Sequence, residues 1–464
     1  MITDTPSLSI AQPHPTGVGV LAKVGLALAS IGLLILLIAL AGVTFSHTGW
    51  FIGAAIVGIV GGTSLYAAEK YLHQPKGVKN NGVWQSNLTA RGIVGWMIGI
   101  LLTGFYVLIY WWPEYLGLGD VQKNIPNTGL VHLFDPISRL FSGSPASQWF
   151  MYGTLYSLAV LSMGIKFLFK YRGNRYHTIR TLVVVGCQLI FAYFIPEILS
   201  SLQHGGAYFN KDIKLFWPLN YSFGYGYNLD AMRSSGGLGM FYLVVGIAMF
   251  ALVAPIITYF VGKRWYCSWV CGCGGLAETA GDPFRQLSSK KMYAWKIERW
   301  LIHSVLAFVT IMTAAVLYGY FSGASQIFGL DIYHWFQKPY GFLIGAIFSG
   351  VVGVGFYPLM GNRVWCRFGC PLAAYMGIIQ RFKSRFRITT NGGQCISCGN
   401  CSTYCEQGID VRSYAQKGQN IVRASCVGCG VCASVCPRGV LKLENNSTDG
   451  RIKDQPELTG LLRD

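Results

Sequence analysis

Eight apolar segments, each long enough to cross a lipid bilayer, constrain the fold of this 464-residue chain more than any other feature. A membrane-spanning helix needs about 20 predominantly apolar residues. Only 12% of the residues are charged, about half the share of an ordinary soluble domain, which argues against a single soluble globule. We therefore predict an all-α polytopic membrane domain over residues 21–361. Its spans are expected near residues 21–45, 49–67, 92–113, 148–169, 178–202, 239–262, 299–321 and 340–360.

Lysine and arginine alternate between the loops. The loops after the second, fourth, sixth and eighth predicted spans are basic, whereas the loops between them hold few cations and balance these with acids. Basic loops of membrane proteins stay on the cytoplasmic side. We therefore expect a cytoplasmic N-terminal tail over residues 1–20 and a cytoplasmic C-terminus. The same bias explains the net charge of +18 without nucleic acid as a partner.

Glycine spacing gives a first indication of helix packing. Gly58 and Gly62 lie four residues apart in the second predicted span. Small residues at this spacing allow membrane helices to approach closely. We expect these two glycines to face a neighbouring helix.

Thirteen of the fourteen cysteines fall in short, regular clusters, and every cluster lies in a loop assigned to the cytoplasm, where thiols stay reduced. The remaining one, Cys187, lies alone in the fifth span, where we expect an inert core residue. Regular short spacings indicate metal ligation rather than a disulfide framework.

Two cysteine runs near the C-terminus give the strongest chemical signal. Cys395-x2-Cys398-x2-Cys401-x3-Cys405 is followed by Cys426-x2-Cys429-x2-Cys432-x3-Cys436-Pro437. In a two-cluster ferredoxin, three cysteines of one run and the fourth of the other bind each [4Fe–4S] cluster. The expected ligand sets are Cys395, Cys398, Cys401 and Cys436 for one cluster, and Cys426, Cys429, Cys432 and Cys405 for the other. Zinc is the alternative, and the doubled three-plus-one pattern argues against it.

These runs define a small α+β ferredoxin domain of the bacterial two-[4Fe–4S] type over residues 392–444, followed by a polar tail over 445–464. The first run has Glu406 where the second has Pro437. This departure leaves the predicted ligands intact and is expected to alter local hydration.

Two further cysteine pairs follow the sixth and eighth spans. Cys267-x3-Cys271 lies after the sixth span, and Cys366-x3-Cys370 lies in a membrane-adjacent connector over residues 362–391. The arrangement resembles an internal repeat in which each unit is a span that ends in a cysteine pair. On a helix, residues four apart share one face, so the pairs together offer four thiolates at one depth. The alternatives are a third iron–sulfur cluster, a redox-active thiol site and buried structural thiols, with Cys273 as a spare ligand.

Other cofactors have little support. His303 is the one histidine clearly inside a predicted span, so a haem held by two histidines is not supported and a core role is expected for His303. Ser322-Gly-Ala-Ser325 resembles a covalent flavin attachment signature. Four small residues at a helix end are weak evidence for flavin, so we expect an ordinary loop at this position.

From the sixth span onward, the two pairs, the second followed by Pro371, and the double ferredoxin run together resemble the NosR/NapH/CcoG group of membrane-bound polyferredoxins. The resemblance covers about the last 200 residues. The chain departs from the group at Gly272, where a proline is expected, at the extra Cys273 and in its larger number of spans. Because the first span begins near residue 21, we expect a NapH-like or shortened NosR-like member without an outer flavin domain.

The resemblance implies electron transfer between the quinone pool or cytoplasmic carriers and a partner reductase. We therefore expect a multi-pass protein of the bacterial inner membrane, in contact with lipid, with a partner reductase or other redox subunits. The alternative is a redox maturation or regulatory factor for a metalloenzyme such as an oxidase or a nitrous-oxide or nitrate reductase. No general acid, base or nucleophile stands out, so an electron-transfer component is favoured over a stand-alone enzyme.

Overall fold

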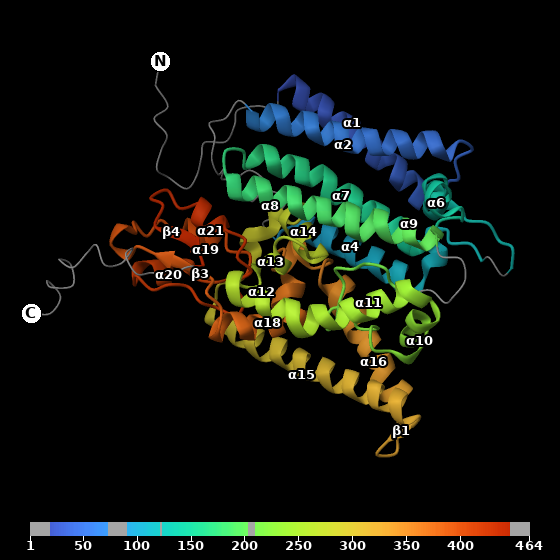
Figure 1. Cartoon of the computed structure of the whole chain (residues 1–464). Coiled ribbons are helices and arrows are strands. Elements are labelled where there is room, and N and C mark those ends of the chain that lie inside the picture. Colours follow the sequence, from blue (N-terminus) through green and yellow to red (C-terminus); the bar gives the residue numbers. More distant parts are fainter. Residues whose placement is uncertain (1–18, 73–90, 121–122, 203–208, 446–464) are drawn as a thin grey trace, which may run out of the picture.

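The computed structural model describes residues 19–72, 91–120, 123–202 and 209–445, in which long helices form a bundle with a small module at one end (Figure 1). Seven helices of the described chain are long and apolar enough to cross a membrane. They are α1 (Val20–Leu40), α2 (Thr48–Leu72), α4 (Ile93–Trp111), α7 (Gln148–Lys170), the continuous helices Arg175–Leu202 and Gly236–Val261, and α15 (Met292–Ser322). Most of the predicted N-terminal tail and of the polar C-terminal tail lie outside the described residues.

Two of these spans contain a π-helical stretch. Arg175–Leu202 consists of α8 (Arg175–Gly186), η2 (Cys187–Phe194) and α9 (Ile195–Leu202). Gly236–Val261 consists of α11 (Gly236–Ala248), η3 (Met249–Val253) and α12 (Ala254–Val261). Between the spans lie the short elements η1 (Pro113–Leu116), α5 (Gly129–Leu133), α6 (Asp135–Ser142), α10 (Gly226–Ser234), and the hairpin β1 (Gln326–Ile327) and β2 (Leu330–Asp331).

The eighth predicted span, residues 340–360, is helical up to Val352, and a turn over residues 353–356 then separates it from a last short helix. It is built from η5 (Tyr333–Gln337), α16 (Lys338–Tyr340), π-helical η6 (Gly341–Val352) and α17 (Tyr357–Met360). The turn between η6 and α17 contains Gly353 and Gly355, and glycine weakens a helix. The segment nevertheless runs antiparallel to α4: the ring of Phe342 packs on Trp111, 5.8 Å between centroids, and a Cβ at Gly355 would touch Thr103.

Helices α1 and α2 pack closely, as the glycine spacing predicts. A Cβ on Gly62 would lie 2.4 Å from the carbonyl oxygen of Gly25, and a Cβ on Gly58 would lie 2.9 Å from that of Leu28. No side chain fits at such distances, so glycine allows the two backbones to touch. The prediction for Gly58 and Gly62 is confirmed.

The small module comprises residues 387–444. Short elements connect the spans to it, and the end of the bundle where it lies is called the module end below. They are α13 (Arg264–Cys267), α14 (Gly272–Glu278), η4 (Asp282–Leu287), η7 (Trp365–Gly369) and α18 (Pro371–Phe382). Figure 1 shows the module beside the ends of α8 and α12.

The module itself contains one antiparallel sheet and several short helices. Strand β3 (Arg387–Thr390) pairs with β4 (Leu441–Glu444), with Arg387 opposite Glu444 and Thr390 opposite Leu441. Between them lie η8 (Gly392–Gln394), α19 (Asn400–Thr403), α20 (Val411–Gln416) and α21 (Val431–Ser434). The sheet therefore includes residues before 392, the predicted start of the ferredoxin domain. The mostly helical fold, with a membrane domain and a small ferredoxin-type module, confirms the predicted fold class.

Candidate metal centres

Four cysteines of the two C-terminal runs surround one cavity at the outer side of the module. Its lining includes Cys395, Cys398, Cys401 and Cys436. Three come from the first run and the fourth comes from the end of the second, as the crossed pattern predicts. Residues 393–394, 396–397 and 437–439, which flank these cysteines, are exposed. We call this space the outer cavity.

The other four cysteines of the runs surround a second cavity, which faces the membrane domain. Its lining includes Cys405, Cys426, Cys429 and Cys432. Residues 426–428 and 430–432 are buried. We call this space the inner cavity. The structure thus brings the two predicted sets together separately, while their role as ligands stays a prediction.

Equivalent backbone turns shape the two cavities. Gly399 and Gly430 have φ of 81° and 80°, and each directly precedes a short helix that carries the third cysteine of its run. The residue before the second cysteine is also left-handed in both runs, with Gly428 at φ 63° and Ser397 at φ 56°. Such turns aim successive backbone N–H groups at one point, where they can donate to cluster sulfurs. Ser397 shows that the first run keeps this geometry without glycine.

Burial makes the thiols of Cys401 and Cys426 weaker acids than an ordinary cysteine. It raises the pKa of Cys401 to about 12 and that of Cys426 to about 11, against backbone N–H groups that lower both. Ligand thiolates must lose their protons, so loading of iron would release them.

Four consecutive carbonyl groups hold the inner cavity against the membrane domain. The carbonyl oxygens of residues 426, 427, 428 and 429 each accept a hydrogen bond from a different side chain of the membrane domain or connector. The four donors are Gln380 Nε2 at 2.8 Å, Ser268 Oγ at 2.7 Å, the Tyr176 hydroxyl at 2.7 Å and Arg180 Nη1. We call this row the carbonyl ladder, and it fixes the loop of Cys426 and Cys429 against α8, α13 and α18.

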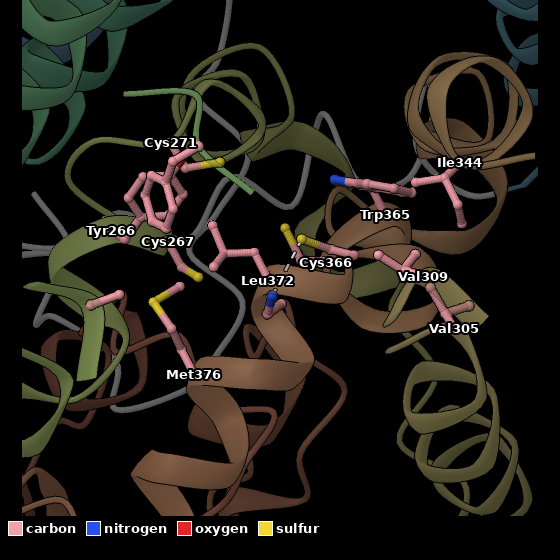
Figure 2. Close-up of a cluster of buried hydrophobic side chains, with 14 of the residues drawn as sticks. Tyr266, Cys267, Cys271, Val305, Val309, Ile344, Trp365, Cys366, Leu372 and Met376 are labelled. Carbon is pink, nitrogen blue, oxygen red and sulfur yellow. Dashed lines mark hydrogen bonds between the residues drawn. The ribbon is translucent and has the colours of Figure 1, made fainter. Parts of the chain in front are cut away.

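The two Cys-x3-Cys pairs lie in one buried cluster next to the inner cavity. Cys267, Cys271, Cys366 and Cys370 all belong to one buried cluster, and Cys429 packs against the same cluster. Figure 2 shows three of the pair cysteines in this cluster together with Leu372 and Met376. The structure therefore brings together two pairs that are about a hundred residues apart in the chain.

Local structure explains how each pair is presented. Cys267 ends α13, and Cys271 precedes α14. Cys370 is the N-cap of α18, where its sulfur accepts a hydrogen bond from the backbone N–H of Ala373 at 3.4 Å. The neighbouring Cys273 thiol lowers the pKa of Cys271 below its usual range, although burial opposes this shift, whereas burial raises the pKa of Cys267 to about 12.

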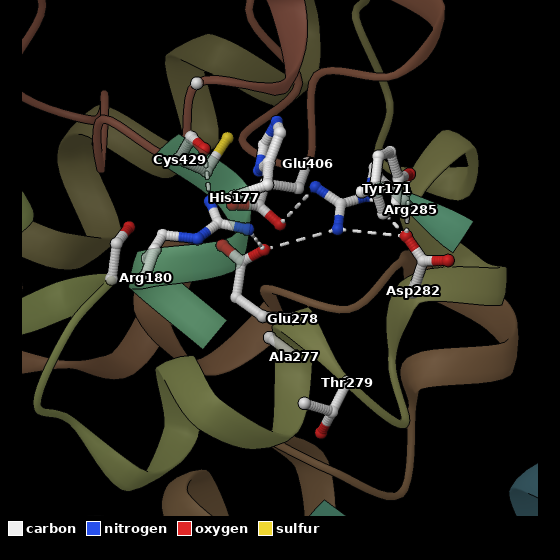
Figure 3. Close-up of polar contacts among 12 residues, drawn as sticks. Tyr171, His177, Arg180, Ala277, Glu278, Thr279, Asp282, Arg285, Glu406 and Cys429 are labelled. Carbon is white, nitrogen blue, oxygen red and sulfur yellow. Dashed lines mark hydrogen bonds and ion pairs between the residues drawn. The ribbon is translucent and has the colours of Figure 1, made fainter. Parts of the chain in front are cut away.

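A buried ion network joins the module to the membrane domain beside the inner cavity (Figure 3). Glu278 accepts from Arg180 at 2.6 Å and from Arg363 at 2.7 Å, and Arg285 lies 3.3 Å away. Glu406 of the module binds Arg285 at 3.2 Å and Arg363 at 3.1 Å. All five side chains are at most 1% exposed. A carboxylate oxygen of each glutamate lies within 4.8 Å of the Cys429 sulfur, a spacing that could hold a metal ion. Guanidinium groups already bind these carboxylates, so an ion-pair network explains the cluster of Glu278, Glu406 and Cys429 better than a metal.

This network also stabilises negative charge close to the cysteines. Arg363 Nη1 donates to the carbonyl of Cys267 at 3.0 Å and lies 3.9 Å from the sulfur of Cys366. Opposing its burial, the guanidinium groups of Arg363 and Arg285 hold the pKa of Glu406 well below its usual range. Sequence reasoning identified Glu406 only as a departure from the Cys-Pro ending and missed its partners. The departure was the available signal, since a buried acid next to a ligand position requires cations around it.

The remaining candidates lie elsewhere. Cys187 is half-buried at the start of η2, on a membrane span. His303 is exposed on α15, which corrects the expectation of a core histidine, because the helix face that carries it borders a cavity instead of the bundle interior. The carbonyl of Ser325 accepts a hydrogen bond from Ile332 at the β1–β2 hairpin, as a loop residue would. The expected absence of flavin stays a prediction.

Two family models match the part of the chain that holds these cysteines. A 4Fe–4S binding domain matches twice, over residues 243–291 and 341–389, and a 4Fe–4S dicluster domain matches residues 366–441. Each copy of the first domain contains one Cys-x3-Cys pair at the equivalent position, which confirms the internal repeat. The chain therefore carries iron–sulfur binding domains both at the pairs and in the module.

Curated relatives share about a third of the chain. YccM of Escherichia coli, named as an electron transport protein, is 28% identical over 181 residues, which are 36% of this chain and 48% of YccM. The methylamine utilization ferredoxin-type protein MauN of Methylobacillus flagellatus is 26% identical over 167 residues, covering 35% of this chain and 56% of MauN. The ferredoxin-type protein NapH of Haemophilus influenzae is 26% identical over 179 residues, covering 37% of this chain and 55% of NapH.

The chain thus spans about half the length of these relatives. No solved structure matches it. The domains, the cysteine spacings and the relatives agree over the same region of the sequence. Over these matched residues the chain carries 4Fe–4S binding domains and is similar to the ferredoxin-type proteins NapH and MauN and to YccM.

Proposed function

We propose that the protein is a membrane-anchored iron–sulfur electron-transfer protein that passes electrons between the quinone pool or cytoplasmic carriers and a partner reductase. The relatives named for electron transport and as ferredoxin-type proteins support the general class. The basic loops at the module end favour a cytoplasmic module at the inner membrane.

The observation that carries this proposal is the continuity of the three cysteine sets. Cys401, Cys426 and Cys432 share one buried cluster, which links the outer cavity to the inner one. Cys429 then packs against the buried cluster of the Cys-x3-Cys pairs, which lies at the end of the membrane domain. Sites in this order would connect the water-facing side of the module to the membrane.

The residues of the chain supply the environment for such a path. The two sets of run cysteines would each hold one [4Fe–4S] cluster, and the pairs would hold a third iron–sulfur group. When bound, a cluster supplies reversible one-electron transfer at a potential set by burial, charge and hydrogen bonds to its sulfurs. The left-handed turns provide the N–H donors, the carbonyl ladder fixes the inner loop, and the ion network offsets negative charge in a site closed to water.

Iron content tests the proposal directly. The full-length protein, purified in detergent without oxygen, should contain iron and acid-labile sulfide and give low-temperature EPR signals after reduction. About eight irons per chain would support two clusters, and about twelve would support a third at the pairs. A colourless, iron-free protein with stoichiometric zinc would overturn the electron-transfer proposal.

The crossed ligand sets make a sharper test. Cys436→Ser should remove the same EPR signal as Cys395→Ser, because both residues line the outer cavity. Cys405→Ser should instead match Cys426→Ser, although Cys405 belongs to the same run as Cys395. If the signals group by run rather than by cavity, the ligand assignment is wrong.

A thiol-based role in metalloenzyme maturation is the second candidate, and the lowered pKa of Cys271 beside Cys273 favours it. A thiol whose pKa is lowered forms the reactive thiolate more readily than an ordinary cysteine does. Alkylation of the anaerobic, iron-loaded protein distinguishes a cluster at the pairs from a redox-active thiol. If the cysteines of both pairs react with the alkylating reagent only after iron is removed, the result supports a cluster. Rapid labelling of Cys271 in the iron-loaded protein supports a redox thiol.

A further inference from the structure

A cavity of about 320 Å³ lies at the module end, between α15, α18 and the module loop 423–425. Its volume is in the range of pockets that hold small ligands. Cys366 lies at one side of the cavity. The charged side chains that line it belong neither to the ferredoxin cavities nor to the ion network.

The lining of this cavity is strongly basic. Its cations come from the segment after α12, from α15, from the connector and from the module, and they are Lys263, Arg299, Arg367, Arg381 and Arg423. Glu298 is its one acid, and Arg367 Nε already donates to that carboxylate at 2.6 Å. The lining therefore carries five positive charges against one negative charge, without counting His303.

Two of these cations are buried and incompletely paired. Arg367 is 2% exposed, and its Nη2 atom has no hydrogen-bond partner among the described residues. Lys263 is 1% exposed, and its ammonium reaches the carbonyl of Ala373 only at 3.4 Å. Burying a cationic donor such as Arg367 Nη2 without a partner is costly, so an anion in the cavity would be stabilised.

An aromatic ring places two more cations at the cavity. The guanidinium groups of Arg299 and Arg423 each lie 5.1 Å from the centre of the Trp295 ring. Arg299 belongs to the membrane helix α15, whereas Arg423 belongs to the module. These cation–π contacts with Trp295 therefore hold one cation of the membrane domain and one of the module beside the same cavity.

Exposed aromatic residues place this cavity at the depth of lipid headgroups. Tyr293 and Trp300 on α15 are 74% and 71% exposed, and Phe382 at the end of α18 is 71% exposed. Aromatic belts mark the membrane–water interface of membrane proteins. Basic pockets between membrane helices at this depth recognise acidic lipid headgroups.

We propose that this cavity binds the phosphate headgroup of one acidic phospholipid, which would join α15, α18 and the module. The phosphate is the shared chemistry of a lipid headgroup and of free phosphate, and the position at the interface favours the lipid. This site is independent of the proposed electron transfer, which does not require it.

Native mass spectrometry of the delipidated, iron-loaded protein tests the site, with phosphatidylglycerol, phosphatidylcholine and inorganic phosphate as separate probes. One phosphatidylglycerol should bind per chain, while phosphatidylcholine should not compete and phosphate at equal concentration should not displace it. Arg299→Gln/Arg381→Gln should weaken phosphatidylglycerol binding about 30-fold, which equals about 2 kcal/mol at 1.4 kcal/mol per tenfold.

The matched control removes the same amount of charge from α15 and from the end of α18. Lys296→Gln/Lys383→Gln changes two exposed lysines on α15 and just after α18 that do not line the cavity, and it should leave the affinity unchanged. Equal weakening by the two double variants, or equal binding of phosphatidylcholine, would overturn the site. Displacement by inorganic phosphate would overturn the lipid as its ligand. Iron content, measured on every variant, separates these outcomes from a failure of the electron-transfer proposal.

Discussion

Replacing Asp282 with asparagine should destabilise the protein by about 2 to 5 kcal/mol. Asp282, in η4, lies 2.5 Å from the ammonium of Lys170 at the end of α7 and 3.1 Å from Arg285. Both Asp282 and Lys170 are less than a tenth exposed. Burial alone would raise the pKa of Asp282, but Lys170 and Arg285 outweigh it and lower the pKa from 3.8 to about 2.

The lower bound follows from this pKa, because each unit corresponds to 1.36 kcal/mol and the shift amounts to about 2 kcal/mol. The upper bound is the cost of leaving the buried Lys170 without a partner, about 3 to 5 kcal/mol. Since the folded-state pKa is depressed, this contribution is fully present above the unfolded value of 3.8 and is lost as the pH falls through about 2.

The assay is equilibrium unfolding in detergent micelles at neutral pH, with Asp120→Asn as the control. Asp120 pairs with Lys123 at 3.1 Å, but the Lys123 side chain is 74% exposed, so the loss should be about 0 to 1 kcal/mol. The double variant Asp282→Asn/Lys170→Gln should lose less than the sum of the single losses. Equal costs for Asp282→Asn and Asp120→Asn would refute the reasoning.

Three further predictions concern the module and its attachment. Gln380→Ala should lower the free energy of unfolding by about 3 kcal/mol and speed proteolytic release of the module. The reason is that the buried amide donates to two module carbonyls and accepts from a backbone N–H. Unchanged proteolysis would contradict this prediction. Gly430→Ala should cost about 1 to 3 kcal/mol more than Gly439→Ala in the same unfolding assay. Both glycines have positive φ, but only at Gly430 would a Cβ meet a neighbour, a tyrosine ring at 2.7 Å, so equal costs would count against the contact. Cys370→Ser should remove about four irons per chain if the pairs hold a cluster, whereas Cys187→Ser should remove none.

Much of the membrane domain follows from the sequence because hydrocarbon imposes a simple length rule. Seven of the expected spans appear as long apolar helices, and the Gly58 and Gly62 spacing identified a close helix pair. The eighth span departs from expectation where Gly353 and Gly355 interrupt the helix, which a hydropathy count does not register. Tertiary contacts with α4 hold that segment, and such contacts are not written in local sequence.

The cysteine spacing predicted which residues surround each cavity of the module, because the chain can bring three closely spaced thiols to one point only by a tight turn. It could not predict the ion network, whose members come from four separated regions and include Arg180 and Glu278. Nor could it predict the carbonyl ladder, since each donor contacts a backbone group with no side-chain signature. Ser397 illustrates the same limit, because it has the left-handed conformation that Gly428 has in the second run.

The unequal enclosure of the two cavities bears on how the protein withstands air. Loops around Cys395, Cys398 and Cys436 are open to water, whereas the loop of Cys426 and Cys432 is covered by the membrane domain. Dissolved oxidants therefore meet the outer set first. If both sets bind clusters as proposed, oxidative loss of iron should begin at the outer set and reach the enclosed inner set later.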